Sequence, residues 1–353
     1  MEFRVERSPQ GHRLVGDGVD VELVNRFLAH LVGRNFAAAT RRAYAYDLLN
    51  FLRFCAERRL GLAQVRPSEV FDYLDWQARP RPSVGRVVVR LAEWDGAAPA
   101  TVNRRVAALR AMFEYALLIG ARADNPVPTA RRSAAGARRR GLLGHLGTSR
   151  HRSSGGRLVV APRLLPESLD LDEVRCFVAD LGTARDRAIA LAMLLGGLRA
   201  GEVRALRLAD ADFGLRRLRV TGKGGRERVV PVDAAFFTEL ATYLREERPS
   251  GCATPECFVV LRGPTAGQAM SEAGLRRIFR THRARAGTPR VRPHRLRHTY
   301  GTELAAAGID LLVLRELMGH ASPETTARYV HLSIATLAAE YATARAQAEA
   351  ARR

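Results

Sequence analysis

Apolar side chains recur at helical spacing through the first third of the chain, and this pattern predicts an all-helical unit over residues 19–128. The clearest stretch is TRRAYAYDLLNFLRFCAERR at residues 40–59, in which tyrosine, leucine and phenylalanine side chains fall on one face. Thr40 is the expected N-cap, because its hydroxyl can accept a hydrogen bond from an early backbone amide. Further helices are predicted to begin near Ser68 and near Ala100.

The helical pattern stops at Pro126, because a proline disfavours the α conformation in the residue before it. Residues 129–164 follow as a segment rich in arginine, glycine and serine, with eight arginines and no acidic residue between residues 130 and 157. Such a segment cannot bury enough apolar surface to offset the entropy of ordering it, so a flexible linker is predicted. It is either an inert tether or a tether that also binds phosphate groups.

Residues 165–353 show a mixed pattern. Acidic residues open a helix near residue 170, and the apolar stretch at residues 185–195 is typical of a buried helix. Residues 215–232, LRRLRVTGKGGRERVVPV, have two strand-like arms around a glycine-rich turn that can take positive φ, as in a β-hairpin. The pattern is helical again from Ser271. The predicted fold is therefore mainly α with a small antiparallel β-sheet in this second domain.

Charge narrows the class of partner. Lys and Arg number 57 against 36 Asp and Glu, a formal net charge of +21, whereas the 47% of hydrophobic residues is ordinary for a folded protein. The excess charge favours a polyanion, either nucleic acid or an anionic membrane surface. Four cysteines in 353 residues exclude a disulfide-stapled scaffold, and the first residues lack the apolar core of a signal peptide. The longest apolar run, residues 188–198, is too short to cross a bilayer, so we expect a cytoplasmic protein.

Arginines on the polar sides of two helices in the N-terminal unit are candidate contacts with a DNA backbone. They are Arg41, Arg42, Arg104, Arg105 and Arg110. The alternative is a solvated polar face on helices that pack in the core.

Four short segments hold the residues that could carry chemistry. They are GGLRAGEV with Arg199 and Glu202, TGKGGRER with Lys223, HRLRHTYGT with His294 and Arg297, and LMGHASPETTARYVH with His320 and Tyr329. Arginine forks suit the oxygens of a phosphodiester and stay charged at any working pH. Tyrosine has a pKa near 10, so as a nucleophile it needs nearby positive charge or a base. Together the segments supply a nucleophile, a clamp for negative charge and groups that transfer protons.

These segments and their order resemble the tyrosine recombinase (phage integrase) family, closely over residues 165–332 and more loosely through the helical N-terminal unit. The resemblance implies that Arg199 and Arg297 bind the scissile phosphate. It implies that Tyr329 attacks this phosphate, giving a 3′-phosphotyrosyl link and a free 5′-hydroxyl. It implies further roles for Lys223 as the general acid, for His294 and His320 in proton transfer and phosphate binding, and for Glu202 as a supporting residue. Neither a metal ion nor ATP or another cofactor is expected.

The resemblance also implies a domain arrangement. The helical unit at residues 19–128 corresponds to the core-binding, SAM-like domain that closes around duplex DNA together with the catalytic domain at residues 165–353. Two departures are the long linker and an apparent insertion between Pro80 and Pro99. The Ala-rich stretch after Leu332 is a strong helix former, and in the family such a segment docks onto a neighbouring protomer. Leu337 and Tyr341 are therefore expected to make a contact between protomers in a tetramer.

For most other residues whose side chains could be reactive or bind a ligand, a structural role is the preferred interpretation. Structural roles are favoured for His298, for the pair Cys252 and Cys257, which lacks a second pair for zinc, and for Trp76 and Trp94, whereas His331 is left undecided.

The leading hypothesis is a site-specific DNA recombinase, the integrase or transposase of a mobile element, that acts as a tetramer on two duplexes. Partner recombinases or accessory proteins are left open. A Xer-type resolvase of chromosome or plasmid dimers shares every one of these residues. A type IB topoisomerase and an inactive DNA-binding or architectural protein are weaker alternatives.

Overall fold

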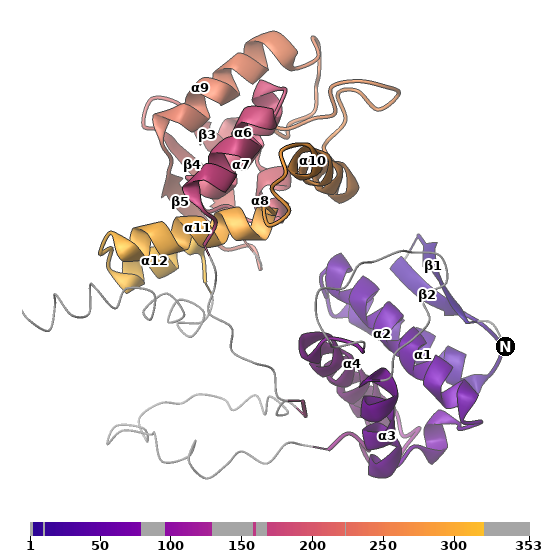
Figure 1. Cartoon of the computed structure of the whole chain (residues 1–353). Helices are drawn as coiled ribbons and strands as arrows, with labels where there is room; N and C mark the ends of the chain where they lie inside the picture. The colour runs from indigo at the N-terminus through magenta and orange to yellow at the C-terminus, as the bar shows by residue number, and fades with distance from the viewer. Residues whose placement is uncertain are drawn as a thin grey trace, which may run out of the picture. The chain divides into compact units, whose positions relative to one another are not determined.

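The computed structural model describes residues 3–9, 11–78, 96–128, 158–159, 168–222 and 224–320. The chain divides into two compact units, Met1–Arg163 and Leu164–Arg353 (Figure 1). Several predictions fall outside the described residues: those for Lys223, Tyr329, His331, Leu337, Tyr341 and Trp94, for most of the linker, and for most of the insertion.

The first unit consists of a short β-hairpin followed by helices. Its elements are β1 Arg4–Ser8, β2 Gly11–Val15, α1 Val19–Gly33, α2 Ala38–Glu57, the 3-10 turn η1 Leu62–Gln64, α3 Pro67–Ala78 and α4 Pro99–Leu118. The sequence pattern did not predict the antiparallel pair β1 and β2. Asn25 of α1 fastens it, because the Asn25 side chain accepts from the backbone N–H of Leu14 and donates to the carbonyl of Leu14.

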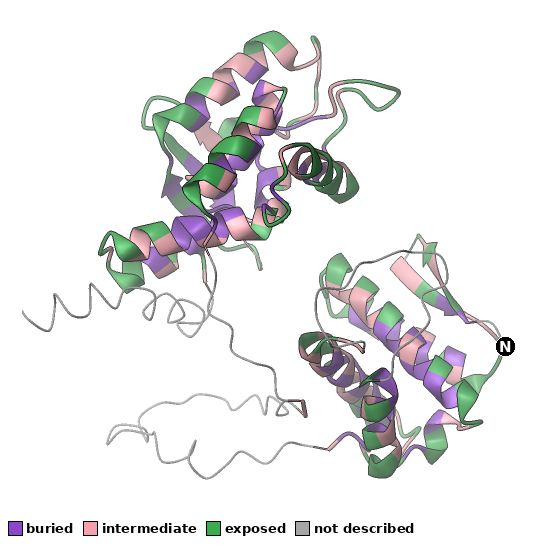
Figure 2. Cartoon of the chain, in the orientation of Figure 1, coloured by how far each residue is buried: buried purple, intermediate pink, exposed green. Residues whose placement is uncertain are grey.

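Helix α2 begins two residues before the predicted N-cap. Ala37 is the N-cap, and its carbonyl accepts from the backbone N–H groups of Thr40 and Arg41 at 2.9 and 3.1 Å. The prediction for Thr40 was therefore wrong: the backbone alone closes the first turn, and no side chain caps it. The helices bury a shared hydrophobic core that includes aromatic rings. Figure 2 shows the buried parts of these helices in purple. Trp76 belongs to this core, with its ring centroid 5.5 Å from that of Phe54.

The second unit is mostly helical with one small sheet, and the predicted fold class is confirmed. Its elements are α6 Leu171–Asp180, α7 Ala184–Leu194, α8 Ala200–Ala205, the 3-10 turn η2 Leu208–Asp210, β3 Ala211–Asp212, β4 Arg217–Thr221, β5 Glu227–Pro231, α9 Ala234–Thr242, the π-helical turn η3 Tyr243–Glu247, α10 Glu272–Arg285, α11 Pro293–Ala306 and α12 Leu311–Met318. The strands pair antiparallel in the order β3-β4-β5. In the turn between β4 and β5, Gly224 and Gly225 have φ of 80° and 77°, which is why this turn is glycine-rich.

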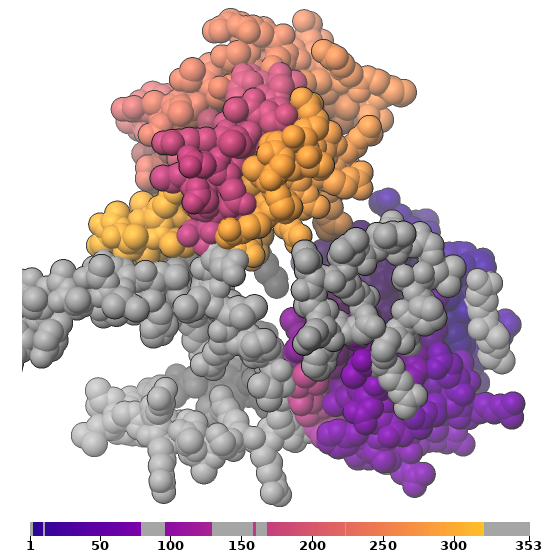
Figure 3. Space-filling view, in the orientation of Figure 1, coloured from indigo at the N-terminus to yellow at the C-terminus, as the bar shows by residue number. Residues whose placement is uncertain are grey.

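Local sequence explains where these helices begin. Asp170 accepts from the backbone N–H of Asp172 ahead of α6, and Asp310 accepts from two backbone N–H groups at the start of α12. Figure 3 shows α6 beside α10 on one face of this unit. There His282 of α10 lies 2.7 Å from the carboxylate of Asp180 at the end of α6.

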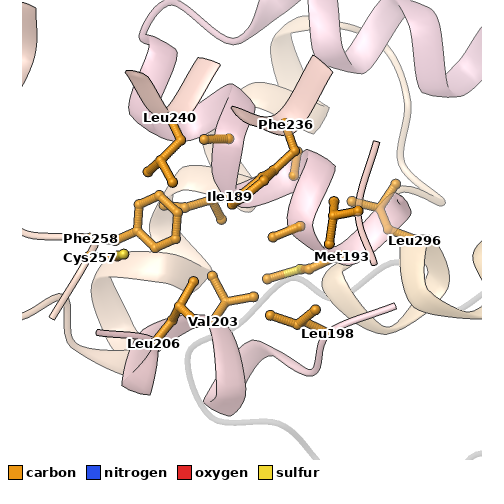
Figure 4. Packing of buried hydrophobic residues seen from close by; sticks show 14 of the residues in the cluster. Ile189, Met193, Leu198, Val203, Leu206, Phe236, Leu240, Cys257, Phe258 and Leu296 are labelled. Carbon is orange, nitrogen blue, oxygen red and sulfur yellow. The ribbon is translucent and has the colours of Figure 1, made fainter. Parts of the chain in front are cut away.

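Helix α7 runs through the middle of the core of the second unit. Ile189 and Met193 are fully buried on it (Figure 4). Leu198, Val203 and Leu296 point into the same core, and each is a sequence neighbour of a predicted site residue. The core therefore fixes the backbone from which the site is built. Among the described residues, no helix is both long and apolar enough to cross a membrane.

Candidate active site

Arg199 is held at the N-cap of α8 by a tight turn. Gly197 in this turn has a φ of 61°, and a Cβ there would lie 2.5 Å from the Tyr300 ring, so only glycine fits. Glu202, in the first turn of α8, accepts from the backbone N–H of Arg199 at 2.8 Å and from its Nη1 at 2.7 Å. The motif GGLRAGEV thus folds into a unit that orients one arginine with one carboxylate.

Arg297 comes from α11 and is almost entirely buried, with 4% of its surface exposed. Its two Nη groups donate to the carbonyls of Gly197 and Met318. Nη1 also lies 3.9 Å from Glu202 Oε2. Arg297 therefore ties α11 to the turn before Arg199 and to the end of α12.

His320 follows directly on the end of α12. Gly319 closes this helix in the left-handed conformation, with φ of 58°, and its carbonyl accepts from Arg199 Nη2 at 2.9 Å. His294 lies in the first turn of α11, where its Nε2 is 2.8 Å from Nε2 of His298 and where Arg297 and Arg199 lower its pKa in addition to burial. The structure thus brings four predicted residues, Arg199, His294, Arg297 and His320, together with Glu202.

Burial and the neighbouring arginines lower the pKa of both predicted imidazoles and so favour their neutral form. Burial, with Arg297 and Arg199 adding to it, lowers the pKa of His320 to about 4. Partial desolvation and the same two arginines lower the pKa of His294. A neutral imidazole can accept one proton or donate one, as proton transfer requires. Burial opposes ionisation of Glu202, but hydrogen bonds from Arg228 and Arg199 prevail and lower the pKa of its carboxyl.

A pocket of about 880 Å³ opens beside these groups. Arg199 and His320 line it, and so do Gly222 and Gly224 of the hairpin turn. Those two glycines flank Lys223 in the sequence; Lys223 itself, the predicted general acid, lies outside the described residues.

Sequence analysis missed Arg228, which lies beside these residues. Its Nη1 and Nη2 donate to the two oxygens of Glu202 at 3.1 and 2.8 Å, and its Nε donates to the carbonyl of Leu317 at 2.9 Å. The strand pattern held a signal for it. Residues alternate between exposed and buried along β5, and the alternation places this arginine on the buried face with Val230.

The arginines predicted to contact DNA lie in the first unit, and their role there stays a prediction. Arg104 pairs with the buried carboxylate of Asp47, and Arg105 donates to Gln77 at 2.9 Å. The further contacts are Arg110 with the carbonyl of Pro128, Arg42 over the ring of Tyr46, and Arg41 beside Gly11. In the second unit, Cys257 is buried in the core and Cys252 Sγ lies 3.1 Å from the Gly267 carbonyl.

Known protein families and relatives match most of the chain. The model of the phage integrase family matches residues 167–335, and that of the phage integrase N-terminal SAM-like domain matches residues 24–119. Tyrosine recombinase XerC of Rhodospirillum centenum is 31% identical, over 93% of this chain and 87% of the relative. XerC of Xanthomonas campestris is 30% identical, over 95% and 92%. XerD of Lacticaseibacillus casei is 28% identical, over 90% and 97%.

Solved structures share the fold. The XerH site-specific recombinase bound to its palindromic difH substrate superposes with a TM-score of 0.60 at 19% identity, over 92% of this chain and 88% of that chain. The Tn1549 transposon integrase in complex with transposon right end DNA gives 0.61 at 17% identity, over 92% and 99%. With relatives at 30% identity along nearly its whole length, this chain belongs to the phage integrase family and is a tyrosine recombinase.

Proposed function

We propose that this recombinase cuts and rejoins DNA at specific sites through a 3′-phosphotyrosyl intermediate, with Tyr329 as the nucleophile. The observation that carries the proposal is the convergence of Arg199 and Arg297 on the carbonyls of Gly319 and Met318, directly before His320, with Arg199 and His320 lining one pocket. These residues come from three separate segments of the chain, and Gly222 and Gly224, the sequence neighbours of Lys223, line the same pocket.

The proposed step is an in-line displacement at phosphorus. The Tyr329 oxygen forms a bond to the scissile phosphorus, the bond from phosphorus to the 5′-oxygen breaks, and that oxygen leaves with a proton from Lys223. The tyrosine proton passes to a neutral imidazole, for which His294 and His320 are the candidates. Arg199 and Arg297 bind the non-bridging oxygens, where negative charge grows in the transition state.

Rejoining reverses this step. The phosphotyrosyl bond keeps the energy of the phosphodiester, so the 5′-hydroxyl of another strand can attack it and release the tyrosine. No step in this sequence draws on ATP or requires a metal ion. In a tetramer on two duplexes, the incoming strand would belong to the second duplex.

Two biological roles are consistent with this chemistry. The sequence led first to the integrase or transposase of a mobile element. The similarity to proteins named XerC and XerD, along about nine tenths of the chain, favours the second role, resolution of chromosome or plasmid dimers. Recombination assays on paired sites taken from the host chromosome and from the ends of neighbouring mobile elements would distinguish the two roles by which pair recombines.

The nucleophile is tested by trapping the covalent intermediate. The recombination site is first recovered from random DNA by selection for binding, and a duplex with this site is then nicked close to the cleavage position. After cleavage, the short fragment that bears the free 5′-hydroxyl dissociates, so rejoining is prevented and the adduct accumulates. We expect an adduct with the wild type and none with Tyr329→Phe, which lacks the attacking oxygen. Tyr115→Phe, which removes the same hydroxyl group from a tyrosine of the first unit that packs against Phe27, is the control and should still form the adduct. An adduct with Tyr329→Phe would contradict the assignment.

A further inference from the structure

Arg228 lies on the face of the hairpin where the other buried side chains are apolar. The buried face of β4 and β5 carries Leu218, Val220 and Val230, and Arg228 on the same face is only 8% exposed. Burying a guanidinium costs free energy unless hydrogen bonds and an opposite charge compensate for it. A charged residue that breaks the local pattern in this way is a candidate for a functional role.

Every nitrogen of the Arg228 guanidinium donates to a protein oxygen. Two of them form a fork on the carboxylate of Glu202, and Nε reaches the carbonyl of Leu317. Glu202 in turn holds Arg199 through a backbone and a side-chain hydrogen bond. Arg228 therefore connects β5, the carboxylate beside Arg199 and the end of α12.

Three guanidinium groups meet three successive carbonyls at the end of α12. Arg228 donates to Leu317, Arg297 to Met318, and Arg199 to Gly319. The last carbonyls of a helix have no partner within the helix and lie at the negative end of its dipole, so cations bind well there. A Cβ on Gly319 would lie 2.9 Å from Nη1 of Arg228, which shows how closely this arginine packs against the residue before His320.

We propose that Arg228 is a positioning residue for strand cleavage, which fixes Glu202 and the last turn of α12 so that Arg199 and His320 are held ready for the scissile phosphate. The proposal rests on the proposed function, because that phosphate is the group the site must receive. Arg228 acts through Glu202 and Leu317, to which its nitrogens already donate.

The first test is the rate of single-turnover cleavage on the nicked duplex described above, with full-length protein. Arg228→Ala should lower the rate at saturating DNA by roughly 10- to 100-fold, because small misplacements of groups around a reacting centre cost that much. The DNA concentration that gives half the maximal rate should stay close to that of the wild type. Arg219→Ala is the matched control, since Arg219 lies on the exposed face of the same hairpin. It should cleave at the wild-type rate.

Two further readouts separate positioning from a merely structural role. Arg228 lines the pocket, so added methylguanidinium can reach the space left by Arg228→Ala and should restore part of the rate. The pH profile should also change. Hydrogen bonds from Arg228 help to keep the pKa of Glu202 below its usual range, so without them the fall in rate at acid pH should begin at a higher pH.

If the alanine variant does not fold, Arg228→Lys tests whether Arg228 is a positioning residue. It keeps the charge but cannot make the two-pronged contact with Glu202, so its rate should lie between those of the wild type and the alanine variant. Wild-type rates and an unchanged acid limb in the Arg228 variants would overturn the inference, as would a loss of DNA binding with an unchanged rate at saturation. If the wild type itself forms no adduct, the proposed function fails and this inference with it.

Discussion

Two arginines of this site, Arg297 and Arg199, differ in the contacts they make because their side chains are buried to different extents. The Arg297 side chain is 5% exposed and donates to two carbonyls, whereas that of Arg199 is 38% exposed and lines the pocket. Arg199 is thus the arginine with more surface available to a ligand, and Arg297 is the more deeply buried of the two. Their roles could be predicted because the segments GGLRAGEV and HRLRHTYGT resemble those of the tyrosine recombinase family. Their meeting could not, because Arg199 and the carbonyl it contacts on Gly319 are 120 residues apart.

His320 should make the stability of the fold depend on pH. Burial, Arg297 and Arg199 lower its pKa to about 4, below the usual 6.5. Between these values the unfolded chain binds a proton that the folded chain does not, so the free energy of unfolding should fall as the pH drops from 6.5 towards 4. Denaturant unfolding at pH 7 and pH 5 should show a smaller loss for His320→Asn than for the wild type. An equal loss in both proteins would contradict the shifted pKa.

At the scale of elements, the pattern of apolar and polar residues correctly predicted those helices and strands that local sequence determines. The helix at residues 184–194 and the hairpin β4–β5 agree with expectation, because apolar spacing and a glycine-rich turn encode them directly. The hairpin β1–β2 was missed because its position depends on hydrogen bonds with Asn25, eleven residues from Leu14. Arg228 was missed for the related reason that its partners, Glu202 and Leu317, are distant in sequence.

The turn between α7 and α8 should be intolerant of a side chain at residue 197. Gly197→Ala would force an alanine into a left-handed conformation and its Cβ into the Tyr300 ring, at a cost of about 2–4 kcal/mol in unfolding free energy. Strand cleavage should fall too, since this turn carries Arg199. Gly201→Ala is the matched control, because a Cβ there meets nothing within 4 Å and alanine favours the helix. Urea denaturation of both variants measures the difference, and equal stabilities would refute it.

At the scale of the whole molecule, the net charge of +21 divides into two parts. A small group of cations belongs to the candidate phosphate site, where Arg199, Arg228 and Arg297 lie around the carboxylate of Glu202. The remaining cations include the predicted DNA contacts of the first unit. Because binding to a long polyanion releases counterions at each phosphate contact, this second part should dominate the salt dependence of DNA binding.

Arg104 offers a direct test of that division. Its side chain is 47% exposed and pairs with Asp47, so it is anchored by one carboxylate while part of it faces solvent. If it contacts a phosphate, Arg104→Gln should weaken binding about equally for all DNA sequences and reduce the slope of log affinity against log salt by about 0.9.

Arg58→Gln is the matched control for this measurement, since Arg58 is 44% exposed and pairs with Asp72 at 2.8 Å. Fluorescence anisotropy of a labelled duplex across a salt series would compare the two variants, with thermal unfolding as a check that both remain folded. Arg58→Gln should leave the slope as in the wild type, because no DNA contact is predicted for it. Equal slopes for the wild type and Arg104→Gln would mean that the exposed surface of Arg104 faces solvent and not DNA, so that the ion pair with Asp47 is its whole role.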